Sequence, residues 1–348
     1  MKKFISITLT TVMLLVLFYG FVGAQSSEVI EYSGKPMTIT IATHSNNQDI
    51  KTVSAFKMKE ELETRSNGKI TVEVYPSSQL LNQSEMVEGI PNGSADIGIT
   101  GLGQWSGVVP EVVILGSMGV FDTEEHYWRA CEGEGGLFDY LAELFDQNAD
   151  TQVMTFLYCG SSDCLLSKNK QIKMPEDMQG LKFRAPNIAM GSAVEALGAT
   201  PISMPLSDVY SALQTGMVEG TWANITTVID FSLTELAPYL TRLPLAYSDA
   251  YGIVIGNMTW NSWPEELQIM VKDISKDLYK YAFEYIRETV EDKWQKCDED
   301  PNLNVYYVAD EDVPAFAKLI GPRHLEIIKD AVSEESYKHM LELVDQFQ

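Results

Sequence analysis

Residues 173–220, KMPEDMQGLKFRAPNIAMGSAVEALGATPISMPLSDVYSALQTGMVEG, alternate between extended and helical patterns and decide the fold class. Residues 181–184 have the apolar pattern of a strand, which Pro186 ends. A helical pattern over residues 189–197 follows and closes at Gly198. The chain therefore passes from a strand to a helix within one short unit.

The same unit is repeated directly afterwards. Residues 200–203 precede a second predicted helix, with Ser207 as its N-cap and Gly216 just past its end. Residues 218–222 then have a strand pattern. Alternating strands and helices predict an α/β fold in which helices cover a largely parallel sheet.

Both flanks of this region continue the alternation. Helices are predicted over residues 84–90 and, by a long apolar stripe, over residues 264–294, and the part after Pro301 adds one strand-like piece and two helices. The other predicted strands are residues 37–43, 69–75, 96–100, 153–158 and 251–255. We find no internal repeat, and a chain of 348 residues is long enough for two domains.

The composition is that of a globular protein with an acidic surface. Hydrophobic residues make up 45% of the chain, and 49 Asp and Glu against 25 Lys and Arg give a formal net charge of -24. Such a surface repels nucleic acid and anionic membranes, so a nucleic-acid-binding role is excluded. A small anion can still bind beside a buried cation in a dry cleft.

The first 24 residues resemble a signal peptide. Lys2 and Lys3 precede an apolar run over residues 4–22, and residues 22–24 are small, as at a signal-peptidase site. An uncleaved membrane anchor is the alternative, because the run is almost long enough to span a bilayer. We expect cleavage, export and a mature chain of residues 25–348.

Cysteines and known motifs give little support to redox, metal or catalytic chemistry. Export permits a disulfide between Cys159 and Cys164, which is as plausible as two thiols, and Cys131 and Cys297 are expected to be buried thiols. No metal-binding motif is present, and no cofactor is expected. The sequence lacks the G-x-S-x-G nucleophile motif, the Walker A phosphate-binding motif and the G-x-G-x-x-G dinucleotide-binding motif. Residues 98–103 resemble the dinucleotide-binding motif only loosely.

Arg184 is the strongest candidate for a ligand contact. It lies at the end of a strand that a proline terminates, and ligands gather beyond the carboxyl ends of strands in α/β sheets. A guanidinium there can bind a carboxylate through two parallel hydrogen bonds. Arg184 could equally hold a neighbouring loop carboxylate in place.

Two runs, residues 173–186 and 197–220, resemble the central signature of the DctP-type solute-binding proteins of TRAP (tripartite ATP-independent periplasmic) transporters. Residues 68–76, 93–98 and 257–267 match as well, so the similarity covers nearly the whole mature chain. It implies a two-lobed Venus-flytrap fold of periplasmic binding proteins, with mixed sheets flanked by helices and a long helix that links the lobes.

The resemblance also implies how the chain divides. Lobe I is expected to comprise residues 36–158 and 249–290, and lobe II residues 159–248 and 291–348. The ligand cleft lies between them. Hinges are expected near residues 158–160 and 247–252.

Several site residues follow from the resemblance. The position of Arg184 usually binds the solute's carboxylate, and Asn224 matches a frequent polar contact, although its side chain could instead cap a loop. His44 and Asn47 would face the cleft from the other lobe, or close a turn. Trp222 could stack on the solute but fits a core position better, whereas Trp105 is expected as an aromatic wall because its glycine-rich loop offers less core to join.

One departure from the family pattern restricts the class of ligand that we expect. Many relatives carry a second arginine where this chain has Ser162, Asp163 and Cys164. A single guanidinium neutralises one carboxylate, so a monocarboxylate with hydroxyl, sugar or aromatic substituents fits better than a dicarboxylate. Asp163 could pair with a cationic group of the ligand or with sugar hydroxyls.

The expected function is binding without catalysis. The protein would be a periplasmic monomer that captures a small organic acid by lobe closure and delivers it to the small and large TRAP membrane subunits. Two alternatives stay open: a binding protein that presents the solute to a sensor, and an exported hydrolase or lyase on the same scaffold.

Overall fold

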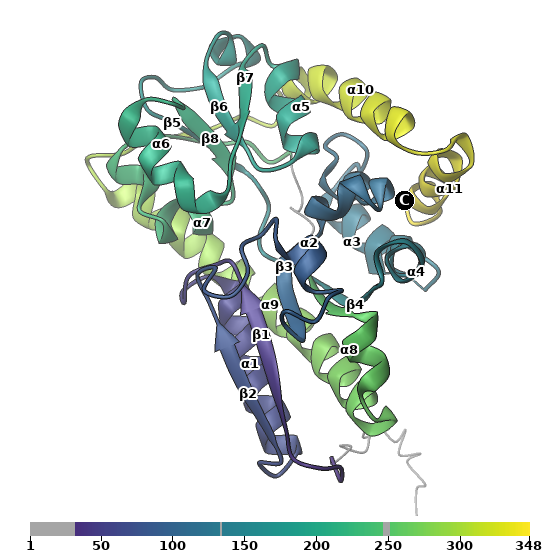
Figure 1. The fold of residues 1–348 in the computed structure, drawn as a ribbon. Coiled ribbons are helices and arrows are strands. Elements are labelled where there is room, and N and C mark those ends of the chain that lie inside the picture. Colours follow the sequence, from purple (N-terminus) through teal and green to yellow (C-terminus); the bar gives the residue numbers. More distant parts are fainter. Residues whose placement is uncertain (1–31, 133, 246–250) are drawn as a thin grey trace, which may run out of the picture.

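The structure is a computed structural model that describes residues 32–132, 134–245 and 251–348 (Figure 1). The predicted signal peptide and part of the second predicted hinge lie outside these residues. Within the described ranges, no helix is both long and apolar enough to cross a membrane.

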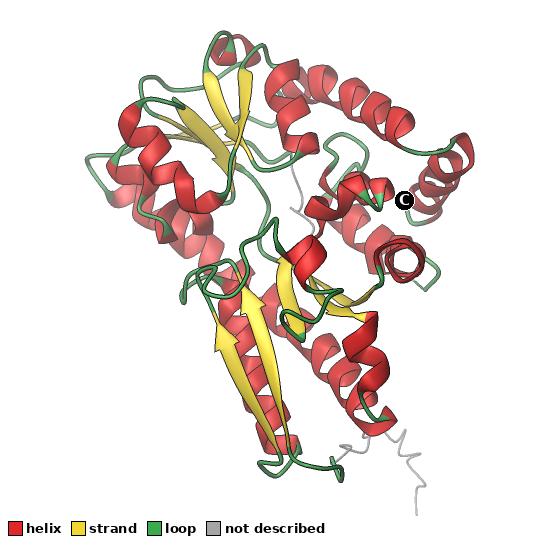
Figure 2. Cartoon of the chain, in the orientation of Figure 1, coloured by secondary structure: helices red, strands yellow, loops and turns green. Residues whose placement is uncertain are grey.

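The described residues form two sheets, each in a lobe of its own (Figure 2). The five-stranded sheet of lobe I has the order β2-β1-β3-β10-β4, in which β1 is parallel to β2 and β3, and β10 is antiparallel to β3 and β4. Its strands are β1 (Met37–Thr43), β2 (Ile70–Tyr75), β3 (Ile97–Gly101), β4 (Thr151–Leu157) and β10 (Tyr251–Gly256).

The six-stranded sheet of lobe II has the order β11-β9-β5-β8-β6-β7. Here β6 is parallel to β7 and β8, whereas β5 is antiparallel to β8 and β9. Its strands are β5 (Cys164–Ser167), β6 (Lys182–Ala185), β7 (Thr200–Ser203), β8 (Gly220–Ala223), β9 (Tyr239–Arg242) and β11 (Asn304–Tyr307).

Helices cover both sheets, and short 3₁₀ turns connect them. The helices are α1 (Ile50–Arg65), α2 (Met86–Gly89), α3 (Glu124–Glu132), α4 (Leu137–Ala149), α5 (Ile188–Ala196), α6 (Val209–Thr215), α7 (Ile225–Asp230), α8 (Asn257–Ser262), α9 (Glu265–Glu299), α10 (Val313–Ala331) and α11 (Glu334–Gln346). The 3₁₀ turns are η1 (Leu102–Gly107), η2 (Pro110–Gly116), η3 (Pro175–Met178), η4 (Leu206–Asp208) and η5 (Leu233–Glu235).

The chain crosses between the lobes after β4 and returns before β10. The two crossing segments lie side by side at lobe II, because the backbone N–H of Leu243 donates to the carbonyl of Asp163 at 2.7 Å. The long helix α9 packs on α1 and β4 in lobe I and on α7 and β11 in lobe II. The predicted two-lobed fold with a linking helix is confirmed.

The last two helices return the chain to lobe I. Helix α10 packs on α5 of lobe II, and its Gly321 lies against Gly119, where a Cβ would come within 3.1 Å of the Gly321 Cα (Figure 1). Helix α11 packs on α3 and α4, and its Met340 and Leu343 join the core of lobe I. The expected division assigned residues 291–348 to lobe II, whereas α11 packs with lobe I.

The local predictions differ from the structure in a few places. Ser207 does not cap α6; it lies in η4, and Asp208 precedes the helix without a side-chain capping bond. Gly216 ends α6 at φ 76°, a left-handed conformation that favours glycine, as predicted. The sequence analysis assigned none of α3, α4, β5 and β9.

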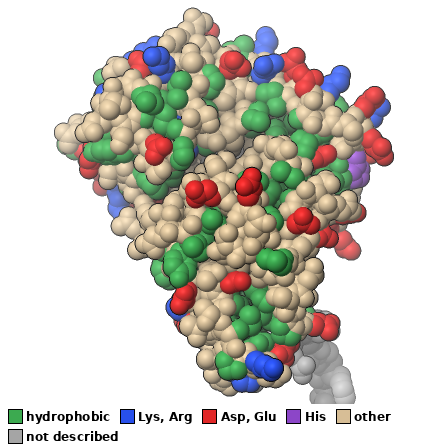
Figure 3. All heavy atoms as spheres, viewed as in Figure 1, with side chains coloured by type: hydrophobic (Ala, Val, Ile, Leu, Met, Phe, Trp, Pro, Cys, Tyr) green, Lys and Arg blue, Asp and Glu red, His purple; other side chains and the backbone are tan. Residues whose placement is uncertain are grey.

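Charged groups are distributed over the surface. Figure 3 shows Asp and Glu side chains on several parts of the face in view, with no single acidic patch. The acidic character of the chain is therefore spread across this face.

Candidate functional site

Arg184 of lobe II is the predicted anchor for a carboxylate. The residue lies on β6 between β7 and β8, and its side chain is only 5% exposed. Its Nε donates to the carbonyl oxygen of Met204 at 3.3 Å. The strand ends at Ala185, so the guanidinium belongs to the carboxyl end of a parallel strand, where ligands gather in such sheets.

A cavity of about 360 Å³ adjoins this strand end. Lobe I lines it with Gly103, Gln104 and Ser106 of η1, and lobe II lines it with residues on either side of Pro186. The amide of Gln104 donates to the carbonyl of Pro186 at 3.4 Å, so the lobes touch at its edge. The cavity therefore lies between the lobes and is lined by the residues that directly follow Arg184.

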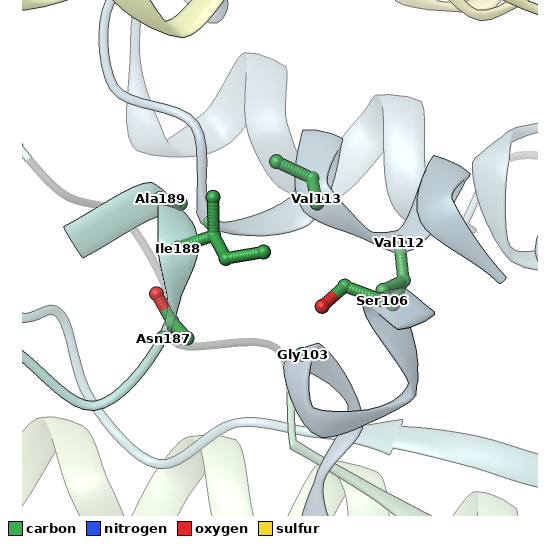
Figure 4. A pocket seen from close by; sticks show the side chains of 8 residues that line it. Gly103, Ser106, Val112, Val113, Asn187, Ile188 and Ala189 are labelled. Carbon is green, nitrogen blue, oxygen red and sulfur yellow. The ribbon is translucent and has the colours of Figure 1, made fainter. Parts of the chain in front are cut away.

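Figure 4 shows the adjacent narrow part of the cleft. Ser106 and Val112 lie on one side, and Asn187, Ile188 and Ala189 lie on the other. Asn187 caps α5, because its side chain accepts a hydrogen bond from the N–H of Met190 at 2.9 Å. This cap fixes the chain direction directly after β6.

His44 of lobe I is affected by the charge of Arg184. It follows β1, and its ring stacks on that of Tyr251, with 6.3 Å between ring centres. Burial, together with the positive charges of Lys51 and Arg184, lowers the pKa of His44 to about 3. His44 is therefore a neutral imidazole that a cation of each lobe affects.

Lys51 and Asp49 were not predicted from the sequence. Asp49 is the N-cap of α1, and its carboxylate lies 2.8 Å from the Lys51 Nζ. Both side chains are buried, and the Lys51 Nζ lies 4.1 Å from the ring centre of Tyr251. The only sequence signal was an Asp two positions before a Lys at the start of a helix, which ordinary surface helices also show.

Asn224 has a structural role in this structure. It is the N-cap of α7, and its Oδ1 accepts from the N–H of Thr227 and the hydroxyl of Thr226, both at 2.7 Å. The side chain is 1% exposed and lies near Gly160 of the first crossing segment. Its oxygen is therefore used for capping, and a ligand could meet only its Nδ2 donors.

The loop after β1 contacts lobe II through a neighbour of the predicted residue. Asn47 is exposed in a turn. Asn46 instead donates from its Nδ2 to the carbonyl of Asp230 in lobe II at 3.1 Å, while its Oδ1 accepts the N–H of Gln48. Sequence reasoning missed Asn46, since adjacent asparagines in a turn give no indication of which one crosses the cleft.

Both tryptophans lie in hydrophobic cores. Trp222 is fully buried, and its Nε1 donates to the carbonyl of Ser162 at 2.7 Å, in keeping with the preferred core position. Trp105 was expected as an aromatic wall because its glycine-rich loop would offer less core to join, but the structure gives it a core position. It is 0% exposed in the core of lobe I, with 5.9 Å between its ring centre and that of Phe145.

Asp163 pairs within the protein. Its Oδ2 accepts from the Nε of Arg242 at 2.9 Å and from the indole N–H of Trp294 at 3.3 Å. Burial raises the pKa of Asp163 to about 6, against the lowering effect of Arg242. In this structure Asp163 thus links both crossing segments to α9, and its pairing with a ligand cation or hydroxyl stays a prediction.

The cysteines form neither the disulfide that export would permit nor a cluster of metal ligands among the described residues. Cys164 is a free, buried thiol, so it forms no disulfide with Cys159. Cys131 and Cys297 are also buried thiols, and burial raises the pKa of each. Among the described residues, no three His, Cys, Asp or Glu side chains come together to hold a metal ion.

The sequence model of the bacterial extracellular solute-binding proteins, family 7 (DctP), matches residues 41–330. The chain belongs to this family. The resemblance to the TRAP-transporter binding proteins is confirmed, and the family is one of non-enzymatic transport components. The hydrolase and lyase alternative is thereby excluded.

Relatives and solved structures agree with this assignment. A solute-binding protein of Roseobacter denitrificans is 27% identical over 248 residues, covering 70% of this chain and 74% of the relative. A TRAP periplasmic solute-binding protein of Desulfovibrio desulfuricans, solved with sn-glycerol-3-phosphate, has a TM-score of 0.81 at 22% identity and covers 89% of this chain and 97% of its own.

A third similar protein comes from Sulfurospirillum deleyianum and was solved with succinate. Its TM-score is 0.79 at 24% identity, with 88% of this chain and 99% of that chain covered. These likenesses show the fold. The ligands named here belong to those proteins.

Proposed function

We propose that this protein is the exported binding component of a TRAP transporter and captures a small organic acid with one carboxylate. The observation that carries the proposal is the position of Arg184, nearly buried at the end of β6 and directly before Ala185 and Pro186, which line a cavity shared by both lobes. The acids bound to family members of the same fold support an anionic ligand. The side chains that replace a second arginine favour a single carboxylate.

Arg184 binds the carboxylate through two parallel hydrogen bonds. Neutral His44 from lobe I and the Nδ2 of Asn224 from lobe II add polar contacts to hydroxyl or other groups of the ligand. Closure excludes water and strengthens the pair between guanidinium and carboxylate. The ligand shifts the protein toward the closed form only by its higher affinity for that form.

Export and delivery complete the proposal. Cleavage after residue 24 releases a periplasmic monomer, and the small and large TRAP membrane subunits read its closed form. The periplasmic location of named relatives in Escherichia coli and Rhodobacter capsulatus supports this compartment. N-terminal sequencing of the exported protein tests the cleavage site, and a start at Gln25 is expected.

A thermal-shift screen of the exported protein against hydroxy, keto, aromatic, sugar and amino acids tests the binding function. A ligand at 100 times its dissociation constant adds about 2.7 kcal/mol of stability. We expect an acid to raise Tm in the wild type and Arg184→Ala to abolish that shift. Arg184→Lys keeps the charge but not the planar fork, so it should retain only part of the shift. A shift that survives unchanged in Arg184→Ala contradicts this role for Arg184.

A further inference from the structure

Asp49 and Lys51 form a buried ion pair with no net charge. Lys51 donates its backbone N–H to the Asp49 carboxylate at 2.9 Å, and its Nζ lies 2.8 Å from the same group. The side chains are 1% and 3% exposed. Because two charges at this distance in a nearly dry site are strongly coupled, neither acts independently on a third group.

The pair lies at the junction of the two lobes. The Lys51 Nζ is 4.1 Å from the ring of Tyr251, the first residue of β10 after the returning crossing segment. Asn46, three positions before Asp49, bonds to Asp230 of lobe II at 3.1 Å. We therefore expect a ligand that extends from Arg184 toward lobe I to approach the pair.

His44 connects the pair to the proposed carboxylate anchor. His44 stacks on Tyr251, whose ring also lies over the Lys51 Nζ, and the charges of Lys51, Asp49 and Arg184 all act on the His44 ring. On the lobe II side, the charges of Asp49 and Lys51 also act on the pKa of Asp230. Asp230 forms its own ion pair with Lys293. Lys51 on the lobe I side and Lys293 on α9 thus each have a carboxylate partner.

We infer that Asp49 is a specificity-determining residue that excludes a second carboxylate, so that the protein prefers acids whose far end carries a hydroxyl or amide. This inference rests on the proposed binding of an organic acid by Arg184. Asp49 neutralises Lys51, a lobe I cation that could otherwise receive a second carboxylate, and it repels that carboxylate directly. A hydroxyl can donate to Asp49 and accept from Lys51, so the same pair favours a neutral polar end.

Ligand pairs that differ only at the far end test the inference by isothermal titration calorimetry. D-Gluconate against D-glucarate compares a hydroxyl with a carboxylate, and succinamate against succinate compares an amide with a carboxylate. For the ligand pair that the wild type binds, we expect its affinity for the singly charged member to be at least tenfold higher than for the dicarboxylate. Equal binding, or a preference for the dicarboxylate, overturns the inference.

Asp49→Asn is the decisive variant, because asparagine retains the N-cap and removes the charge. It leaves Lys51 available to a second carboxylate, so the preference should shift toward the dicarboxylate by at least tenfold. Glu60→Gln is the matched control: it removes the same charge from an exposed site on α1, about 16 Å along the helix. Its preference should equal that of the wild type. An unchanged preference in Asp49→Asn overturns the inference.

A double variant covers the case in which a lone buried Lys51 prevents folding. Asp49→Asn with Lys51→Gln again has no net charge, and we expect it to prefer the singly charged acid, though less strongly than the wild type. A dicarboxylate preference in this variant contradicts the charge argument. Failure of the proposed function looks different, because Arg184→Ala would then leave the binding of both members of each ligand pair unchanged.

Discussion

The backbone N–H of Met118 donates a 2.7 Å hydrogen bond to the Nδ1 of His324. This bond fixes the tautomer, so the Nε2 carries the proton and donates to the carbonyl of Ala189 at 2.8 Å. Met118 follows η2 of lobe I, and Ala189 lies on α5 of lobe II. A neutral His324 on α10 therefore joins both lobes.

This arrangement predicts a loss of stability in acid. Burial lowers the pKa of His324 from 6.5 to about 4, so the folded protein binds fewer protons than the unfolded chain at this residue. Neutral His324 therefore adds about 3 kcal/mol to the free energy of unfolding above about pH 6.5. This stabilisation is lost as the pH falls toward 4. Denaturant unfolding at pH 7, 5.5 and 4.5 measures it.

His324→Gln should be less stable at pH 7 and should depend less on pH than the wild type. His339→Gln is the matched control, because His339 on α11 is 48% exposed. Its pH dependence should equal that of the wild type. If the free energy of unfolding of His324→Gln falls with pH as steeply as that of the wild type, another group is responsible. His44, whose pKa burial lowers to about 3, is then the next candidate.

Asn46 should affect ligand binding through lobe closure. Asn46→Ser keeps a hydroxyl that can accept the N–H of Gln48, but serine is too short to reach the carbonyl of Asp230. One interlobe hydrogen bond contributes about 1 kcal/mol, so we expect affinity to fall about fivefold. Calorimetry against the best acid measures this, with the exposed Gln48→Ala as control. Unchanged affinity in Asn46→Ser would mean that this bond does not favour the ligand-bound form.

Arg242 should stabilise the junction of the crossing segments. Arg242→Met leaves the Asp163 carboxylate buried without its ion-pair partner, which costs about 3 kcal/mol. Adding Asp163→Asn should recover most of this loss, since the buried charge is gone. Glu291→Gln, which removes the exposed partner of Arg242, should cost at most about 1 kcal/mol. Urea unfolding distinguishes these values, and equal losses in Arg242→Met and Glu291→Gln would contradict the account.

Trp105 should matter for stability and not for binding. Trp105→Phe leaves a small cavity against Phe145, with an expected loss of about 1 kcal/mol. Ligand affinity should stay within twofold of the wild type. A fivefold or greater loss of affinity without a loss of stability would restore the role of an aromatic wall.

Several features of the fold could be predicted from the sequence because local patterns determine them. Residues 37–43 alternate as a strand and form β1, and the apolar stripe after Pro264 predicts α9. The central motifs indicated both the family and the end of β6 that holds Arg184. These features depend on residues that are close together along the chain.

The remaining contacts depend on tertiary structure. Asp163 and Arg242 are 79 residues apart, and their pairing follows from the antiparallel alignment of β5 and β9. The position of Tyr251 above Lys51 likewise requires β10 to lie beside β3. Trp105 was misjudged because its glycine-rich loop is helical in the structure and turns the ring toward α4. None of these contacts has a local sequence pattern.

The central claim is that Arg184 binds the carboxylate of a small acid between the lobes. A crystal structure of the exported protein with the acid that gives the largest thermal shift tests it most directly. We predict both carboxylate oxygens at about 2.8 Å from guanidinium nitrogens of Arg184, with His44 facing the ligand from lobe I. A carboxylate bound elsewhere, with Arg184 still held only by protein groups, would contradict the account.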